Sequence, residues 1–335
     1  MSAIADNALL QVRDLKVHFP LRKGVGVAGG VVKAVDGVSF DVAAGRTIAL
    51  VGESGCGKST TAYAVIGLER ATEGKIIFDR RDITRLERRE RAALARDIQI
   101  VFQDPSAALN PKMTIADSIA EPLAIAGWTR ADRRKRVAEL LDRVGLPAAF
   151  AERLPNAVSG GQRQRIVIAR ALALSPRLLI LDEPVSALDV SIRSQILNLL
   201  MELQRDLKLA YLFISHDLSV VRHIADEAIV LYLGTIAERG PIDALFGAPR
   251  HPYTQALLSA IPLPDPIAQR RREKIILTGD LPSPLSPPKG CPFISRCPIR
   301  EDVCATARPL LADAPDGTSA ACFVRAGSKP LPVAA

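Results

Sequence analysis

The stretch Gly52-Glu-Ser-Gly-Cys-Gly-Lys-Ser59 fits the pattern of a phosphate-binding P-loop, in which four residues separate a first glycine from a Gly-Lys-Ser ending. An apolar run at residues 48–51 precedes it, and residues 60–66 favour a helix, so the loop joins a strand to a helix. The glycines let backbone N–H groups converge on phosphates, and the helix N-terminus adds positive potential. We therefore predict a nucleotide site on an α/β fold.

Individual residues of this loop have separate predicted roles. We expect Lys58 to reach the β- and γ-phosphates and Ser59 to ligate Mg²⁺. Cys56 is expected to be a small, buried side chain within the loop. The predicted nucleotide-binding residues of the loop are Gly52, Ser54, Gly55, Cys56, Gly57, Lys58, Ser59 and Thr60.

A second apolar run, Leu178-Leu-Ile-Leu-Asp-Glu183, ends in two acids. A strand this apolar is buried, so carboxylates at its end need a cation or a hydrogen-bonding task. Asp182 suits the Mg²⁺ shell, and Glu183 suits orienting or deprotonating an attacking water. One acid alone could simply cap a following helix, but two acids in a chain with a P-loop favour ATP hydrolysis.

The rest of the first 245 residues alternates short apolar runs with helical stretches, as a parallel α/β sheet requires. A glycine-containing loop is predicted at residues 21–30, and a mainly helical insertion at about 105–158. The predicted strands cover residues 10–19, 31–35, 47–51, 98–102, 177–181 and 209–215.

Composition narrows the function classes. The chain has 335 residues with a formal net charge of +8, which suits nucleic acid, anionic lipid or a nucleotide without choosing among them. Only 4% of residues are aromatic, which argues against a stacking platform for nucleic acid. No apolar run reaches the roughly 18 residues that span a bilayer. The first seven residues lack the features of a signal peptide, so we expect a cytoplasmic chain whose membrane contact comes through a partner.

Further motifs identify a family resemblance. Val158-Ser-Gly-Gly-Gln162 resembles the signature motif of ATP-binding cassette (ABC) ATPases, with Val158 where leucine is usual. Gln103 resembles the Q-loop residue, Ser186-Ala-Leu-Asp189 the D-loop, and His216 the switch histidine of that family. The resemblance covers about residues 8–245, in the family's order and spacing. It implies a P-loop ABC ATPase fold with an antiparallel β subdomain and an α-helical insertion.

The resemblance also implies site roles. Phe19 would stack on adenine, His216 would contact the γ-phosphate, and Gln103 would contact both Mg²⁺ and the attacking water. The implied Mg²⁺ ligands are thus Ser59, Gln103 and Asp182. The signature residues Ser159, Gly160, Gly161 and Gln162 would engage ATP held by an opposite subunit, so that hydrolysis requires a dimer. The D-loop residue Asp189 is also assigned to the nucleotide site.

The last quarter of the chain, predicted as a separate extension over residues 246–335, resembles one branch of the family. His251-Pro-Tyr-Thr254 and the stretches at 103–111 and 279–288 are typical of oligopeptide, dipeptide and nickel importers. We assign His251 no catalytic role. The proline-rich stretch at 279–288 is expected to be a stiff, extended strap.

Four cysteines follow, at Cys291, Cys297, Cys304 and Cys322, with intervals of five, six and seventeen residues. In a cytoplasmic chain such a group favours a metal site over disulfides. Thiolate-only ligation suits Zn²⁺ or an iron–sulfur cluster, although the spacing matches neither a zinc ribbon nor the common ferredoxins. Branch members with this cysteine set resemble [4Fe–4S] binders; Zn²⁺ and reduced structural thiols remain open.

The resemblance implies an ATPase subunit of a peptide importer at the cytoplasmic face of the cell membrane. Its implied partners are a second, paralogous ATPase, two integral membrane permease subunits and, indirectly, an extracytoplasmic solute-binding protein. A homodimer remains an alternative, and nickel chelates or glutathione-like compounds remain alternative cargoes. A soluble ABC ATPase acting on nucleic acid is disfavoured by the absence of tandem cassettes or long coiled-coil insertions, and a redox-sensing module could coexist with transport.

Overall fold

The computed structural model describes residues 8–21, 30–262, 265, 267, 270, 274–279 and 282–329. The sequence predictions for the first seven residues, for the loop at 22–29 and for residues 280–281 of the expected strap lie outside this part of the chain. Within it, no helix is both long enough and apolar enough to cross a membrane.

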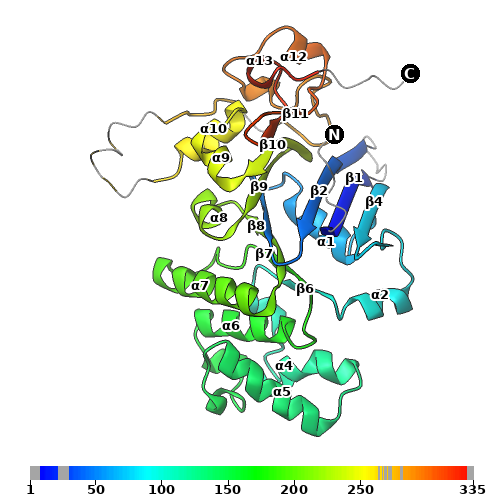
Figure 1. Cartoon of the computed structure of the whole chain (residues 1–335), viewed down its shortest axis with the longest axis vertical. Helices are drawn as coiled ribbons and strands as arrows, with labels where there is room; N and C mark the ends of the chain where they lie inside the picture. Colours follow the sequence, from blue (N-terminus) through cyan, green and yellow to red (C-terminus); the bar gives the residue numbers. More distant parts are fainter. Residues whose placement is uncertain are drawn as a thin grey trace, which may run out of the picture.

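The N-terminal part forms an antiparallel sheet, as the family resemblance implied (Figure 1). Strand β2 extends well beyond the predicted residues 31–35 because the buried positions Val38, Phe40 and Val42 continue the alternation of one apolar face. The sheet has the order β2-β1-β4-β5, formed by β1 (Ala8–Leu21), β2 (Gly30–Ala43), β4 (Glu73–Phe78) and β5 (Arg81–Asp82).

The central sheet has the order β11-β12-β10-β9-β3-β8-β7-β6. Its strands β3, β6, β7 and β8 are parallel and mostly buried, which explains their near-continuous apolar sequences. The P-loop follows β3, which lies between β8 and β9. The bounds are β3 (Thr47–Val51), β6 (Ile98–Val101), β7 (Leu178–Asp182), β8 (Ala210–Ser215), β9 (Glu227–Tyr232) and β10 (Thr235–Pro241).

The predicted insertion is helical and lies at the opposite end of the molecule from the C-terminal segment (Figure 1). Helix α4 packs on α5 and α6 through an apolar face that includes Ile115, Ile119 and Leu123. The helices from the P-loop to the insertion are α1 (Lys58–Ile66), α2 (Arg88–Leu94), α3 (Pro105–Ala108), α4 (Ile115–Ile125), α5 (Arg130–Arg143), and the short turns Ala148–Phe150 and Pro155–Ala157. Those after it are α6 (Gly160–Ala171), α7 (Val190–Leu207) and α8 (Leu218–Ile224).

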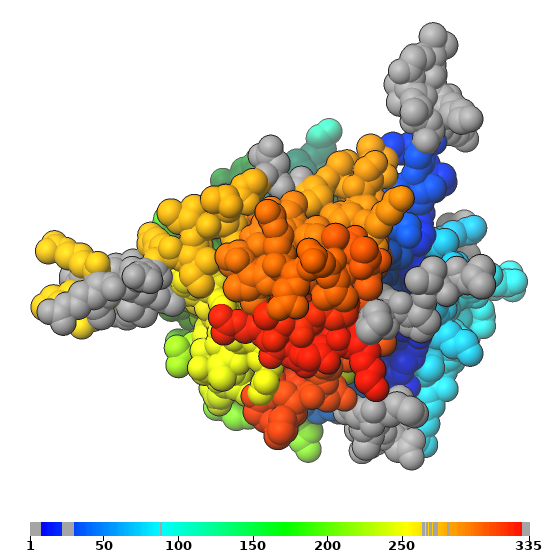
Figure 2. All heavy atoms as spheres, turned by 90° about the horizontal axis from the view of Figure 1, so that it is seen from above, coloured from blue at the N-terminus to red at the C-terminus, as the bar shows by residue number. Residues whose placement is uncertain are grey.

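The C-terminal segment, which comprises the described residues from 242 to 329, continues the central sheet. Its short strand β12 pairs with β10, through Glu238 opposite Ala320. Figure 2 shows the orange and red residues of this segment packed over the yellow helices and beside the blue N-terminal strands. Its elements are α9 (Ile242–Gly247), α10 (Pro252–Ser259), the turn η3 (Ile294–Arg296), α12 (Val303–Thr306), β11 (Ala312–Asp313), β12 (Ser319–Ala320) and α13 (Phe323–Ala326).

Candidate nucleotide site

The P-loop follows the C-terminal end of β3 and leads into α1. Gly57 has φ 103°, and a Cβ atom there would lie 2.2 Å from the carbonyl oxygen of Ala34. Only glycine combines that backbone conformation with such a close approach of a neighbouring strand. The loop conformation therefore depends on its sequence and on the packing of β2 against it.

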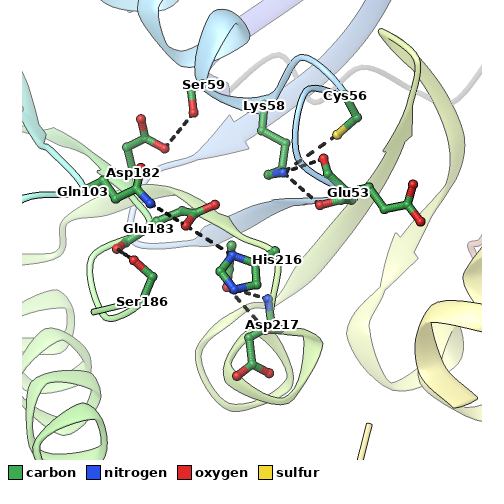
Figure 3. Close-up of polar contacts among 12 residues, drawn as sticks. Glu53, Cys56, Lys58, Ser59, Gln103, Asp182, Glu183, Ser186, His216 and Asp217 are labelled. Carbon is green, nitrogen blue, oxygen red and sulfur yellow. Dashed lines mark hydrogen bonds and ion pairs between the residues drawn. The ribbon is translucent and has the colours of Figure 1, made fainter. Parts of the chain in front are cut away.

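Lys58 is the cation of the loop. Its side chain is buried, and Nζ donates to the carbonyl oxygens of Gly52 at 2.8 Å and Glu53 at 3.0 Å (Figure 3). A cavity of about 530 Å³ opens beside it. The cavity is lined by Ala34, Ser54, Gly55, Gly57, Lys58, Ser59, Thr60, Gln103, Glu183 and His216. Residues predicted from four separate motifs thus meet around one space large enough for a phosphate chain.

Asp182 lies at the end of β7 behind this cavity. It accepts hydrogen bonds from Ser59 Oγ and Tyr63 Oη, both at 3.0 Å. Burial is the largest cause and raises the pKa of Asp182, outweighing the opposing effects of these two hydrogen bonds and of the Lys58 charge. A hydroxyl and a carboxylate oxygen side by side are donors that Mg²⁺ prefers, so the residues fit the ion. The Tyr63 contact was not predicted from the sequence.

Glu183 is held in a special conformation. Its backbone has φ 48°, in the left-handed region that non-glycine residues rarely adopt. Its Oε2 accepts from Gln103 Nε2 at 3.0 Å and lies 3.2 Å from His216 Nδ1 (Figure 3). Glu183 therefore contacts both of the other side chains predicted to act on the water, Gln103 and His216, at the cavity wall.

The signature residues lie elsewhere in the chain's fold. Ser159 caps α6, and Gln162 closes a capping box with it. Gly161 faces α7 so closely that a Cβ atom would lie 2.5 Å from Ile192 Cγ2. Asp189 is the N-cap residue of α7. Among the described residues, none from 159 to 162 lines the cavity beside Lys58.

Phe19 is also outside that lining. It lies near the end of β1, opposite Val32 of β2, and packs partly buried against the core of the antiparallel sheet. Its predicted contact with adenine stays a prediction.

The four C-terminal cysteines are free thiols. Burial raises the pKa of Cys291 to about 12, and the neighbouring thiols of Cys304, Cys297 and Cys322 add to the increase. Within the described residues, however, no three His, Cys, Asp or Glu side chains are arranged to hold one metal ion. The structure therefore does not support the predicted metal site, because Cys291 and Cys304 pack as small apolar groups in the main core.

Sequence reasoning missed two residues that contact the P-loop from the C-terminal segment. Arg296 forms an ion pair with Glu53, which holds the pKa of Arg296 above its usual range. Tyr253 Oη accepts a hydrogen bond from the Glu53 backbone N–H. The His251-Pro-Tyr-Thr254 motif was the available signal for Tyr253, whereas Arg296 carries no recognisable motif.

Comparison with known proteins places these features in context. A family model described as ABC transporter matches residues 35–186, and one described as oligopeptide/dipeptide transporter, C-terminal region, matches residues 237–304. The oligopeptide transport ATP-binding protein AppF of Bacillus subtilis is 50% identical over 327 residues, covering 97% of this chain and 99% of AppF. The dipeptide transport ATP-binding protein DppF of Escherichia coli is 48% identical, covering 96% of each chain.

Solved structures agree with the fold. A dimeric, post-hydrolysis structure of the ATP-binding cassette MJ0796 bound to ADP and Pi has a TM-score of 0.62 and 29% identity. The match covers 70% of this chain and 98% of MJ0796. CbiO1 of Clostridium perfringens, part of the transporter complex cbiONQ, has a TM-score of 0.63 and 28% identity, covering 72% of this chain and 92% of CbiO1. These similarities confirm the predicted fold class.

Proposed function

Because the chain belongs to the ATP-binding subunits of ABC transporters, in their oligopeptide/dipeptide branch, we propose that it hydrolyses ATP to energise peptide import across the cytoplasmic membrane. The observation that carries this proposal is the meeting of Lys58, Ser59, Glu183 and His216 around one cavity, with Asp182 directly behind Ser59. The near full-length similarity to named peptide transport subunits supports the choice of cargo.

The site residues have distinct proposed roles. Lys58 neutralises phosphate charge, and the Ser59 hydroxyl and Asp182 carboxylate hold Mg²⁺ together with Gln103. That ion, when bound, neutralises charge on the phosphates. Glu183 accepts a proton from the attacking water, and His216 orients that water and the γ-phosphate. The contacts of Glu183 with Gln103 and His216 support this division, since one wall carries all three groups.

We propose that the site is completed by a second subunit. Ser159 and Gly161 open the 12-residue helix α6, whose N-terminal amides suit a phosphate, yet they do not line this chain's own cavity. They are therefore assigned to ATP held by a partner, which in turn supplies the equivalent residues. The partner proposed from the sequence is a paralogous ATPase, with a homodimer as the alternative.

The remaining partners are proposed from the family. Two integral membrane permease subunits would receive the motion of the helical insertion, and an extracytoplasmic binding protein would deliver cargo. This arrangement assigns the chain to the cytoplasmic face of the membrane. Nickel chelates and glutathione-like compounds are the alternative cargoes.

Co-purification tests this assignment. The tagged full-length chain, extracted from membranes in mild detergent, is expected to carry integral membrane subunits and to show ATPase activity stimulated by a peptide-loaded binding protein. A chain that hydrolyses ATP but purifies with nucleic acid and without membrane subunits would instead support the soluble alternative.

The cysteine group carries a separate proposal, which rests on the sequence resemblance: a [4Fe–4S] cluster, or Zn²⁺, held by Cys291, Cys297, Cys304 and Cys322. The thiols of Cys297, Cys304 and Cys322 lie near enough to Cys291 to raise its pKa, so ligation requires the side chains to rearrange and the thiols to lose their protons. Protein purified without oxygen is expected to contain iron or zinc in proportion to protein. Cys304→Ser should lower that metal content and Cys56→Ser should not. Wild-type protein free of both metals would contradict the proposal.

A further inference from the structure

The C-terminal segment contacts the P-loop directly at Glu53. Arg296 Nη1 donates to Glu53 Oε2 at 2.7 Å, and Nη2 donates to Oε1 at 3.1 Å. The Arg296 side chain is 10% exposed and that of Glu53 is 31% exposed. A two-point ion pair this sheltered fixes both distance and orientation, unlike a mobile surface pair.

The backbone of Glu53 is held as well. Its N–H donates to Tyr253 Oη at 2.9 Å, and its carbonyl oxygen accepts from Lys58 Nζ at 3.0 Å. The same residue therefore joins the cation of the P-loop to two side chains of the C-terminal segment. A shift of Glu53 would change the position of the carbonyl group that orients Lys58.

Glu53 is not itself placed to bind phosphate. It is absent from the residues that line the cavity beside Lys58. In Figure 3 its carboxylate points away from Glu183 and His216. Its side chain lies on the opposite side of the loop, where it pairs with Arg296 of the C-terminal segment.

The packing around Tyr253 and Arg296 holds these two side chains in place against Glu53. Tyr253 is fully buried, with its ring 4.8 Å from that of Tyr232 and 5.6 Å from that of Phe293. His251 caps α10 by accepting from the Tyr253 backbone N–H at 3.1 Å, which holds the start of this helix. Phe293 and Arg296 both belong to the short segment between Cys291 and Cys297. The His-Pro-Tyr motif and this segment thus converge on one residue of the P-loop.

We propose that Arg296 is a positioning residue for the P-loop: acting through Glu53, the C-terminal segment holds the loop in its phosphate-binding conformation and raises the affinity for ATP. The physical basis is preorganisation, since a loop already held in place loses less conformational freedom when phosphate binds. This proposal rests on the proposed role of the loop in ATP binding.

The test is titration of the full-length chain with a fluorescent MgATP analogue, which reports the dissociation constant and the number of sites separately. Arg296→Met removes the charge and hydrogen bonds but keeps an extended side chain, and Glu53→Gln removes the charge from the other partner. Each is expected to weaken binding about fivefold with the number of sites unchanged. Because both changes break one interaction, the double variant should bind about as well as either single variant.

A matched control is available in Arg177→Met. Arg177 forms a similar two-point pair with Asp79, at 2.6 and 3.2 Å, between exposed residues outside the C-terminal segment. Its loss should leave the dissociation constant unchanged. Arg296→Lys, which retains the charge without the planar fork, should recover part of the affinity.

Three results would count against the proposal. Arg296→Met could bind the analogue as tightly as wild type, the two single effects could add in the double variant, or both variants could lose sites while the remaining sites keep wild-type affinity. The last result would show a purely structural role. If Arg296→Met does not fold, Arg296→Lys and Glu53→Gln still show whether the affinity falls while the number of sites stays unchanged, and wild-type affinity in both would contradict the proposal. Failure of wild-type protein to bind the analogue would overturn the proposed function instead.

Discussion

Glu183→Gln is expected to lower the rate of ATP hydrolysis by about 10²–10⁴-fold, the usual contribution of a general base, while ATP still binds. Gln has the same shape but cannot accept a proton from water. Its side-chain oxygen can still accept the hydrogen bond from Gln103, now 3.0 Å to Glu183 Oε2. Because ATP persists in the site, the variant should also accumulate as an ATP-bound dimer with its partner. Phosphate release and size-exclusion chromatography with ATP measure the two effects.

The matched control is Glu139→Gln on α5. Glu139 is half exposed and pairs only with Arg136 in the described structure, away from the cavity. Its hydrolysis rate should equal that of wild type. Normal turnover in Glu183→Gln would remove the assignment of Glu183 as general base and leave Asp182 or His216 as the group to examine.

Lys58→Ala is expected to weaken ATP binding by about 100-fold or more. Charge-assisted hydrogen bonds contribute about 1.5–3 kcal/mol each, and about 1.4 kcal/mol corresponds to a factor of ten. Lys58 Nζ now bonds two loop carbonyls, at 2.8 and 3.0 Å, so its removal also loosens the empty loop. Equilibrium titration with labelled ATP measures the loss, and thermal melting without nucleotide measures the effect on the fold.

Lys112→Ala serves as the comparison, because Lys112 is exposed in the loop before α4 and does not line the cavity. It should bind ATP as wild type does. Wild-type affinity in a folded Lys58→Ala protein would contradict the phosphate-binding role of the loop, since no other lysine or arginine lines the cavity in the described residues.

Part of this site could be predicted because its chemistry is local in sequence. The P-loop after β3, the acids at the end of β7 and His216 after β8 each lie at the end of a buried strand, and parallel strands bring such ends to one edge of a sheet. The length of β2 was underestimated, because Asp36 and Gly37 interrupt the apolar alternation before it resumes at Val38. The spatial arrangement of the cysteines could not be predicted either, because spacing along the chain does not determine which thiols lie close together.

The contact between Arg296 and Glu53 is the clearest example of a feature that could not be predicted from the sequence. The two residues are 243 positions apart, and Tyr253 is 200 positions from Glu53. Sequence alone was sufficient to identify the phosphate loop and the carboxylates, because each motif lies at the end of one buried strand, where its residue types and spacing dictate local backbone shape and charge. Only the tertiary structure placed the C-terminal segment against that loop. This placement depends on the pairing of β12 with β10 and on the aromatic packing of Tyr232, Tyr253 and Phe293, which no local pattern encodes.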